Sequence, residues 1–351
     1  MRTEGLLEAF SRRDPAALAR AISLVENQED GFERVLAHAY ASVARGAARR
    51  IGVTGPPGAG KSTLTERLIQ AYRGEGLRVG VVAVDPTSPF TGGALLGDRI
   101  RMESTSLDPG VFIRSMATRG THGGLATTTE EVADLLEAFG FERILIETVG
   151  VGQTELDIAS TADTTTLVLV PESGDAIQTL KAGVMEIADV YVINKSDRPG
   201  ADKLRQEVEV MLGIRRGNAF RHVGPHHHAA TTRRPGGQAV TSPTGVEPSV
   251  WDAPVVPTVA VRGEGIVELL SALERHAEYL AASGGLALRR RERVRRRLRA
   301  VTERAVRQWV WDATHADELL AERLDDVAQG RKNPYDVAAE VVEQVKIGVM
   351  R

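Results

Sequence analysis

The sequence predicts an α/β fold in which helices cover both faces of a mostly parallel β-sheet. Two observations support this prediction: short apolar segments alternate with helix-compatible segments, and a glycine-rich loop follows the first of them. The expected strands are residues 50–54, 79–84, 143–147, 165–170, 190–194 and 255–261. Because strands joined through helices become parallel neighbours, we expect one large domain over residues 47–282.

The segments before and after this domain are predicted to be helical. Residues 1–46 carry apolar side chains at helical spacing, which indicates an N-terminal helical extension. Residues 283–351 have the same spacing and indicate a C-terminal helical arm. Residues 289–299 include eight arginines beside an apolar stripe made by Val294, Leu298, Val301 and Trp309. An amphipathic arm that packs on a partner or on itself, with solvated arginines outside, explains both features, whereas a nucleic-acid-binding patch explains only the arginines.

Residues 215–250 interrupt the expected domain with a stretch rich in Gly, Pro, Ser and Thr. Such a composition is typical of a flexible surface insertion. Four of the eight histidines of the chain lie in it: His222, His226, His227 and His228. Adventitious binding of transition metals by this cluster stays open as an alternative.

Residues 55–62, GPPGAGKS, match the phosphate-binding motif G-x-x-x-x-G-K-[ST] and lie between a predicted strand and a predicted helix. Glycines allow the tight turn that brings backbone N–H groups and the positive end of the helix dipole against phosphate oxygens. We expect Lys61 to reach the β- and γ-phosphates and the Ser62 hydroxyl to bind Mg²⁺. The nucleotide-binding residues predicted here are Gly55, Gly58, Ala59, Gly60, Lys61, Ser62 and Thr63.

A second motif, N-K-S-D, follows the predicted strand at residues 190–194 and indicates which base is bound. The Asp197 carboxylate can accept hydrogen bonds from N1–H and the exocyclic amine of guanine. Adenine offers neither donor in that arrangement, so the carboxylate would be left unpaired. Asn194 is expected to tie this loop to the phosphate loop, and the Lys195 stem to cover one face of the base. The two motifs together predict a P-loop GTPase that binds GTP and GDP.

Three acidic residues are candidates for a magnesium site: Asp85, Asp98 and Glu147. Asp85 and Glu147 end predicted strands, and carboxyl ends of parallel strands face one crevice. Since Mg²⁺ keeps several waters, we expect Ser62 and one or two carboxylates to bind it directly. Gly150 is expected to present its N–H to the γ-phosphate, and this contact would distinguish bound GTP from bound GDP. Lys61, Glu147 and Gly150 are therefore the catalytic candidates from spacing alone.

The composition is that of a cytoplasmic enzyme. The chain has 351 residues, a formal net charge of −3 and no cysteine, which excludes disulfides, thiolate nucleophiles and cysteine-based metal sites. No apolar run reaches the length of a membrane span. We expect neither a nucleic-acid nor a membrane partner.

Four long runs of the chain resemble the methylmalonyl-CoA mutase-associated G-protein family of the MeaB/ArgK type. They are GPPGAGKST, VAVDPTSPFTGGALLGDRIRM, ILIETVGVGQTE and PESGDAIQTLKAGVMEIADVYVINKSD. The resemblance implies a homodimeric GTPase chaperone of an adenosylcobalamin-dependent acyl-CoA mutase, which gates cofactor loading and protects the mutase. It also implies that Gln178 and Lys181 belong to a partner-responsive switch. Val259 and Ala260 would support the base within T-V-A-V-R-G-E-G, which departs from the plain S-A-x-x-G pattern.

Three other functions remain open from the residues. A metal-insertion GTPase would explain the histidine cluster, and a transporter-associated kinase would use the same phosphate loop. An interaction module would bind GTP without turnover.

Overall fold

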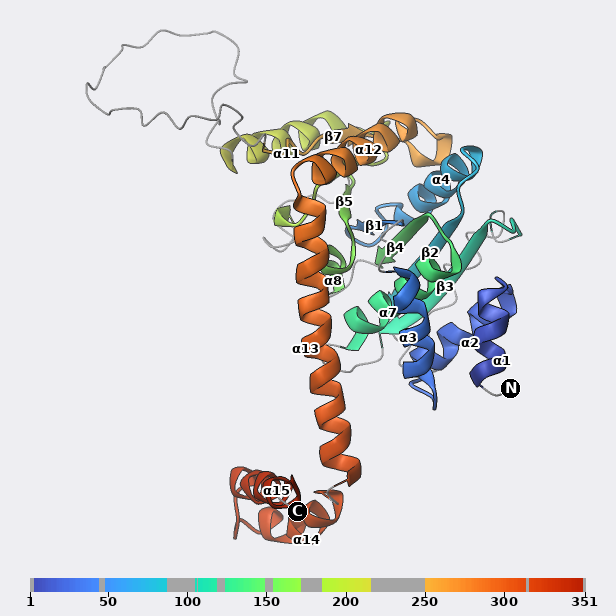
Figure 1. Ribbon diagram of the computed structural model, residues 1–351. Helices are drawn as coiled ribbons and strands as arrows, with labels where there is room; N and C mark the ends of the chain where they lie inside the picture. Colours follow the sequence, from blue (N-terminus) through green and yellow to red (C-terminus); the bar gives the residue numbers. More distant parts are fainter. Residues whose placement is uncertain are drawn as a thin grey trace, which may run out of the picture. The chain divides into compact units, whose positions relative to one another are not determined.

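The computed structural model describes residues 3–43, 48–86, 105, 107–118, 124–148, 154–171, 185–215, 250–313 and 316–349. Its centre is a seven-stranded, all-parallel sheet in the order β3-β2-β4-β1-β5-β6-β7 (Figure 1). The strands are β1 (Arg49–Thr54), β2 (Val79–Pro86), β3 (Val111–Thr118), β4 (Arg143–Thr148), β5 (Thr164–Leu169), β6 (Val190–Ile193) and β7 (Val255–Pro257). The predicted fold class, an α/β fold with a mostly parallel sheet, is confirmed.

Two strands differ from the prediction. β3 was not expected, and it lies at one edge of the sheet with Arg114 and Ser115 at its middle. The Arg114 guanidinium forms an ion pair with Glu26 of the helix beside it, so this polar edge strand lacks the apolar run that signals a buried strand. The predicted strand 255–261 is shorter, because β7 ends at Pro257 and residues Ala260–Arg262 form the 3₁₀ turn η1.

Helices cover both faces of the sheet, as the alternating pattern predicts. One apolar cluster joins β1, β2 and β5 to helices α4 (Lys61–Gly74) and α12 (Ile266–Ala282). On the other face, side chains of β2 and β4 pack with α7 (Gly124–Phe139) and α8 (Thr154–Thr161). Helix α11 (Ala201–Arg215) packs on alternate residues of β5 and β6 on that same face. The buried strands are therefore apolar on both sides, which explains their near-continuous hydrophobic runs.

Three helices precede the sheet: α1 (Thr3–Ser11), α2 (Pro15–Glu26) and α3 (Phe32–Val43). Helix α2 begins with an Asp14 side chain that accepts from the Ala16 N–H, followed by proline at its first position. Apolar side chains of all three helices join the cluster around α7, including Leu18 and Ile22, which are fully buried. The N-terminal helices therefore form one core with the face of the sheet that α7 covers.

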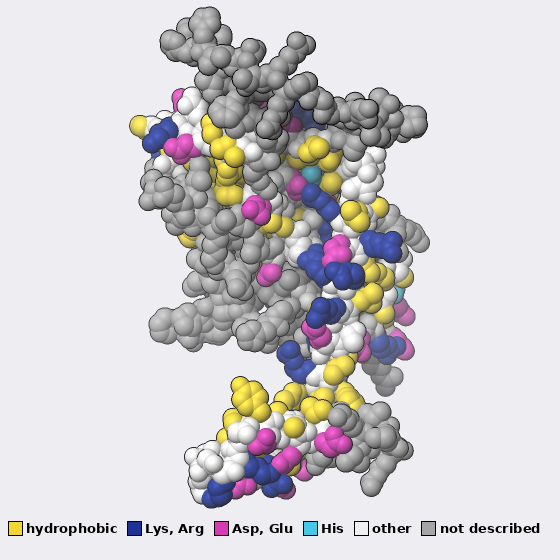
Figure 2. Space-filling view, turned by 90° about the vertical axis from the view of Figure 1, so that its left-hand side faces the viewer, with side chains coloured by type: hydrophobic (Ala, Val, Ile, Leu, Met, Phe, Trp, Pro, Cys, Tyr) yellow, Lys and Arg dark blue, Asp and Glu magenta, His cyan; other side chains and the backbone are white. Residues whose placement is uncertain are grey.

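The chain after α12 continues through Ser283 and Gly284 into α13 (Gly285–Ala313), α14 (Ala316–Ala328) and α15 (Pro334–Val349). Contacts divide the protein into two compact units, Met1–Arg290 and Arg291–Arg351. The start of α13, from Gly285 to Arg290, therefore belongs to the first unit. Along the rest of α13, hydrophobic side chains are exposed among arginines (Figure 2), and they include Val294, Leu298, Val301, Val306, Trp309 and Trp311. Among the described helices, none is both long and apolar enough to cross a membrane.

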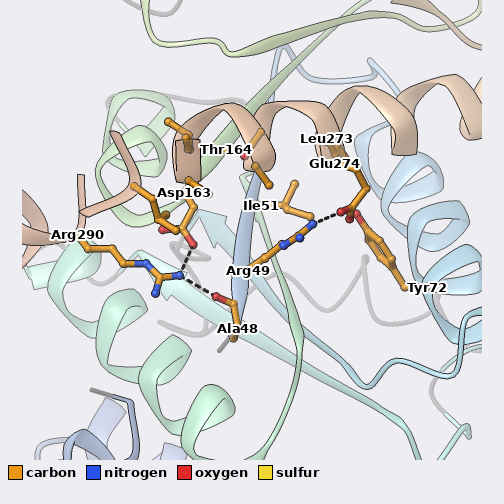
Figure 3. A pocket seen from close by; sticks show the side chains of 13 residues that line it. Ala48, Arg49, Ile51, Tyr72, Asp163, Thr164, Leu273, Glu274 and Arg290 are labelled. Carbon is orange, nitrogen blue, oxygen red and sulfur yellow. Dashed lines mark hydrogen bonds and ion pairs between the residues drawn. The ribbon is translucent and has the colours of Figure 1, made fainter. Parts of the chain in front are cut away.

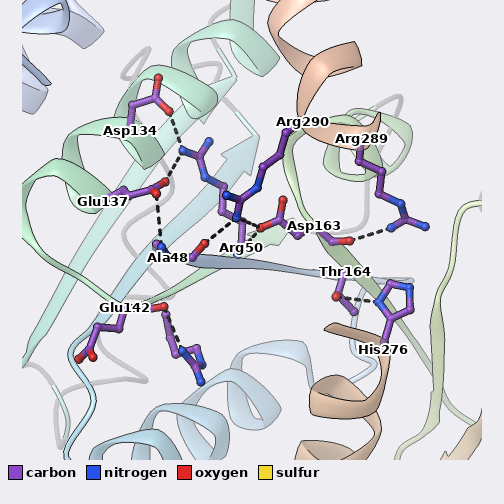
Figure 4. Close-up of polar contacts among 11 residues, drawn as sticks. Ala48, Arg50, Asp134, Glu137, Glu142, Asp163, Thr164, His276, Arg289 and Arg290 are labelled. Carbon is purple, nitrogen blue, oxygen red and sulfur yellow. Dashed lines mark hydrogen bonds and ion pairs between the residues drawn. The ribbon is translucent and has the colours of Figure 1, made fainter. Parts of the chain in front are cut away.

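The start of α13 is bound by two arginines to the end of the sheet where the parallel strands begin (Figure 4). Arg289 donates two hydrogen bonds to the Asp189 carboxylate, at 2.7 and 2.8 Å. Arg290 donates to the Asp163 carboxylate at 3.1 Å. Burial alone would raise the pKa of Asp189, but hydrogen bonds from Arg289 and His276 outweigh it and lower that pKa to about 2. These two aspartates directly precede β5 and β6, so the helix start is tied to the strand starts.

Candidate nucleotide-binding site

The predicted phosphate loop connects the carboxyl end of β1 to the start of α4. It therefore lies at the end of the sheet where all the parallel strands have their carboxyl ends. Two of its glycines are required by close contacts. A Cβ atom at Gly55 would lie 2.1 Å from the Val168 carbonyl oxygen, and one at Gly60 would lie 2.4 Å from Nδ2 of Asn194. Both have positive φ, 142° and 84°. The loop therefore takes a compact conformation that a residue with a side chain would strain.

Lys61 is the first residue of α4 and is buried. Its Nζ donates to the carbonyl oxygens of Gly55 at 2.8 Å and Pro56 at 3.0 Å. A buried ammonium group needs such partners, because an unpaired buried charge is strongly disfavoured. Two carbonyl groups of the loop thus hold the Lys61 ammonium group beside the backbone N–H groups that are predicted to bind phosphate.

Ser62 and Glu147 lie together at this edge. The Ser62 hydroxyl donates to Oε1 of Glu147 at 2.6 Å, and the Glu147 side chain is only 4% exposed. The parallel register of β1 with β4 sets this contact, since Glu147 is the partner of Val53 just before the phosphate loop. A hydroxyl and a carboxylate at hydrogen-bond distance form a set of hard oxygen donors that suits Mg²⁺.

The other acidic candidates have less structural detail. Asp85 lies on β2, two residues beyond the partner of Glu147 in the β2–β4 ladder, so its backbone is at the same edge. Nothing is described of its side chain. Asp98, Gly150, Gln178 and Lys181 lie outside the described residues, as do His222, His226, His227 and His228. Within the described ranges, no group of three or more His, Cys, Asp or Glu side chains is arranged to hold a metal ion.

Asn194 joins three segments of the site and is 3% exposed. Its Nδ2 donates to the carbonyl oxygen of Ala59 in the phosphate loop at 2.8 Å. Its Oδ1 accepts from the Ala260 N–H at 3.1 Å and from the Thr258 hydroxyl at 3.2 Å. One amide side chain therefore ties the phosphate loop to the segment after β7. Sequence reasoning anticipated the first link and missed the second, which depends on the pairing of β6 with β7.

The loop after Asn194 carries the predicted base-reading residue. Lys195 has a positive φ of 55°, which turns the chain sharply, and the Ser196 N–H donates to the Thr258 carbonyl at 3.0 Å. The Asp197 carboxylate accepts from Nη1 of Arg262 at 3.1 Å. Asp197 is thus brought beside η1, at the side of the site that Asn194 also contacts.

The segment of η1 is fixed by further contacts that sequence reasoning missed. Arg67 of α4 donates to the carbonyl oxygens of Ala260 at 2.9 Å and Val261 at 2.6 Å. The Val259 N–H donates to the Glu264 carbonyl at 3.1 Å. A charged pair two residues apart around a glycine, Arg262 and Glu264, was the available signal for a structured turn; Arg67 had none, because its partners are backbone carbonyls.

A cavity of about 170 Å³ lies beside α12 at the opposite end of the sheet, where the strands begin (Figure 3). Arg49 and Thr164, the first residues of β1 and β5, line it together with Tyr72. An ion pair between Arg49 and Glu274 closes one side, and burial raises the pKa of the Tyr72 hydroxyl. This cavity is separate from the phosphate loop, which follows the other end of β1.

Residues 18–315 match the family described as methylmalonyl-CoA mutase-associated GTPase MeaB. A putative GTPase of Pyrococcus abyssi is 44% identical over 340 residues, covering 97% of this chain and 96% of its own length. The mitochondrial methylmalonic aciduria type A homolog of Mus musculus is 36% identical over 290 residues, covering 78% of this chain and 63% of its own length.

Among solved structures, a LAO/AO transport system kinase superposes with a TM-score of 0.64 and 26% identity, covering 98% of this chain and 97% of its own. Its fold therefore matches over nearly the whole length. The family match and the long, closely related GTPase sequences confirm the predicted family and its GTPase class. The chain belongs to the methylmalonyl-CoA mutase-associated GTPase family.

Proposed function

We propose that the protein is a GTP-hydrolysing chaperone of an adenosylcobalamin-dependent acyl-CoA mutase of the methylmalonyl-CoA mutase type. It gates cofactor loading and protects the mutase. The family supports the partner. The observation that supports the nucleotide site best is Asn194, whose hydrogen bonds to Ala59 and Ala260 unite the phosphate loop and the base loop in one site.

Base selection rests on Asp197. Its carboxylate accepts hydrogen bonds only, so it pairs with the N1–H and amine donors of guanine and disfavours adenine. Asn194 holds the loop that presents it, and the Ala260 N–H faces the same amide. The stem of Lys195 covers the base, and Val259 and Ala260 support it from the other side.

Phosphate binding rests on the loop of Gly55, Gly58, Ala59 and Gly60 and on the start of α4 at Lys61, Ser62 and Thr63. Lys61 would exchange its carbonyl contacts for phosphate oxygens. Ser62 and Glu147 fit a magnesium site, to which Asp85 and Asp98 would contribute, and the bound ion would neutralise charge on the phosphates. Gly150, Gln178 and Lys181 complete the proposal as the switch that senses the γ-phosphate and the partner.

Hydrolysis in such a site depends on position and charge more than on covalent chemistry. Lys61 stabilises negative charge on the transferred phosphoryl group, and Glu147 positions the Ser62 hydroxyl. We expect slow turnover by the protein alone and acceleration by the mutase. Partner completion of comparable sites accelerates hydrolysis by up to about 10⁵-fold.

The C-terminal arm is proposed to form a homodimer. Exposed hydrophobic side chains on α13, among them Val294, Leu298 and Trp309, support this proposal, because such surface is usually covered by a partner. Light scattering of the intact protein tests it: a monomer at micromolar concentration would contradict the dimer.

The test of the proposed function combines nucleotide binding with mutase association. GDP should bind much more tightly than ADP, and the protein should co-purify with its adenosylcobalamin-dependent mutase. The mutase should raise the rate of phosphate release from GTP in the native protein and not in Lys61→Ala. Equal affinities for GDP and ADP would refute the base assignment, and absence of both complex and acceleration would refute the chaperone role.

The transporter-associated kinase remains a second candidate because a LAO/AO transport system kinase has the same fold. A kinase would leave the γ-phosphate on a protein acceptor. Release of all labelled γ-phosphate as inorganic phosphate, in the presence of candidate acceptors, would exclude this alternative.

A further inference from the structure

We propose that Arg262 is a positioning residue for base specificity, which orients the Asp197 carboxylate toward guanine. The proposal rests on the guanine site proposed above and extends it to a residue outside the N-K-S-D motif. Its basis is a chain of contacts from Glu264 through Arg262 to Asp197 at the side of the site where η1 lies.

The guanidinium of Arg262 is held from one side by a paired carboxylate. Its Nε donates to Oε1 of Glu264 at 2.7 Å and its Nη2 donates to Oε2 at 3.2 Å. These hydrogen bonds raise the pKa of Arg262 and lower that of Glu264, so each group stabilises the charged form of the other. The two-pronged contact fixes the plane of the guanidinium, as Arg–carboxylate pairs do.

The remaining nitrogen, Nη1, donates to Oδ2 of Asp197 at 3.1 Å. The backbone that carries Arg262 is itself anchored, because Arg67 binds the two preceding carbonyl groups of η1. Gly263, with a φ of 75°, then turns the chain so that Glu264 returns beside Val259. The donor that reaches Asp197 is therefore fixed by both its side chain and its main chain.

An Asp197 carboxylate that accepts one hydrogen bond from Arg262 can still accept two more from guanine. Each carboxylate oxygen has two lone pairs, so Oδ2 can accept from Arg262 and from a base, while Oδ1 is available for a second donor. The terminal torsion of an aspartate is otherwise broad, and half-exposed side chains rotate readily. Holding Oδ2 sets the plane of the carboxylate, which guanine must match with two parallel donors.

The contact has little value for stability. The side chains of Arg262 and Glu264 are 50% and 58% exposed, and ion pairs at such positions contribute little to folding. Pre-orientation of a recognition group, in contrast, increases affinity because less ordering is needed on binding. A competing reading is that Arg262 blocks Asp197 until guanine displaces it. The two readings predict opposite changes in affinity when Arg262 is removed.

The experiment compares GDP with inosine diphosphate, which has N1–H and lacks the 2-amino group. Arg262→Ala should weaken GDP binding by roughly fivefold to tenfold and inosine diphosphate binding by less, since only guanine needs both oxygens aligned. The ratio of the two affinities should therefore fall. Arg205→Ala, which removes an arginine paired with Glu209 on α11, is the matched control and should leave the ratio unchanged.

A double-mutant cycle identifies the route of the effect. If Arg262 acts through Asp197, then Arg262→Ala should add little to the loss already caused by Asp197→Ala, and full additivity would overturn the proposal. Tighter GDP binding by Arg262→Ala, or an unchanged ratio of GDP to inosine diphosphate affinity, would also overturn it. These outcomes are distinct from failure of the guanine site itself, in which the wild-type protein would bind GDP and ADP equally and both proposals would fall. Unfolding of Arg262→Ala in urea is expected to match wild type.

Discussion

Replacement of Asn194 by alanine should damage both stability and nucleotide binding, because this buried amide joins three segments. The substitution removes the bonds to the Ala59 carbonyl and the Ala260 N–H and one to the Thr258 hydroxyl. A buried backbone group left unpaired costs about 1–3 kcal/mol, so the two orphaned backbone groups predict a loss of about 2–6 kcal/mol. Urea unfolding at equilibrium measures this loss directly.

The same substitution should also weaken GDP binding by the folded protein, since the phosphate loop and η1 no longer share a hydrogen-bond partner. Titration calorimetry under conditions where the variant is fully folded measures the affinity. Asn27→Ala, at an exposed position after α2, is the control and should change the free energy of unfolding by less than about 1 kcal/mol. Wild-type stability and wild-type GDP affinity in Asn194→Ala would refute the reasoning.

Four further outcomes follow from the structure. Lys61→Ala should abolish phosphate release in a steady-state assay while circular dichroism shows a folded protein, because the Lys61 ammonium group binds carbonyl oxygens of the phosphate loop; unchanged turnover would remove the loop from the mechanism. Gly60→Ala should weaken GDP binding by more than about tenfold, since its Cβ would lie 2.4 Å from an Asn194 atom at positive φ, and native affinity would contradict the strain. The lowered pKa of Asp189 contributes stability that is present above its unfolded value of 3.8 and lost as pH falls through about 2, roughly 2 kcal/mol in all. Acid titration of unfolding should therefore show wild type converging on Asp189→Asn at low pH, and parallel curves would contradict the assignment. Truncation after Arg290, which keeps both anchoring arginines, should leave GDP binding intact in gel-filtered protein, and loss of binding would show that the site needs the second unit.

Local signals in the sequence were enough to predict six of the seven strands and the helices that separate them. The phosphate loop follows a buried strand and precedes a helix, so its place in the fold could be predicted from neighbouring residues in the sequence. The link from Asn194 to Ala260 could not be predicted in the same way, because it joins β6 to a segment that follows the long stretch at residues 216–249. Strand β3 was missed because an edge strand with Arg114 at its middle has a weak hydrophobic pattern.

The roles of Arg67 and Arg262 were invisible for a different reason. An arginine that binds backbone carbonyls leaves no partner residue to recognise in the sequence, and surface arginines are common. The contact of Arg262 with Asp197 requires the 3₁₀ turn at η1, where a strand was predicted. Shortening of that strand is therefore what brings the guanidinium beside the base loop.

Strand β6 has only four residues, and the residues directly before and after it make contacts with different parts of the protein. Asp189, before it, holds Arg289 of α13, and Asn194, after it, holds the phosphate loop. Five residue steps separate Asp189 from Asn194, which is about 17 Å at the rise of an extended chain. Because β5 and β6 are paired residue by residue, a slip of one position would turn Tyr191 and Ile193 to the wrong face. The four-residue length of β6 thus fixes how far Asn194 at the nucleotide site lies from Asp189 beside the start of α13, and its register fixes which face each of its side chains meets.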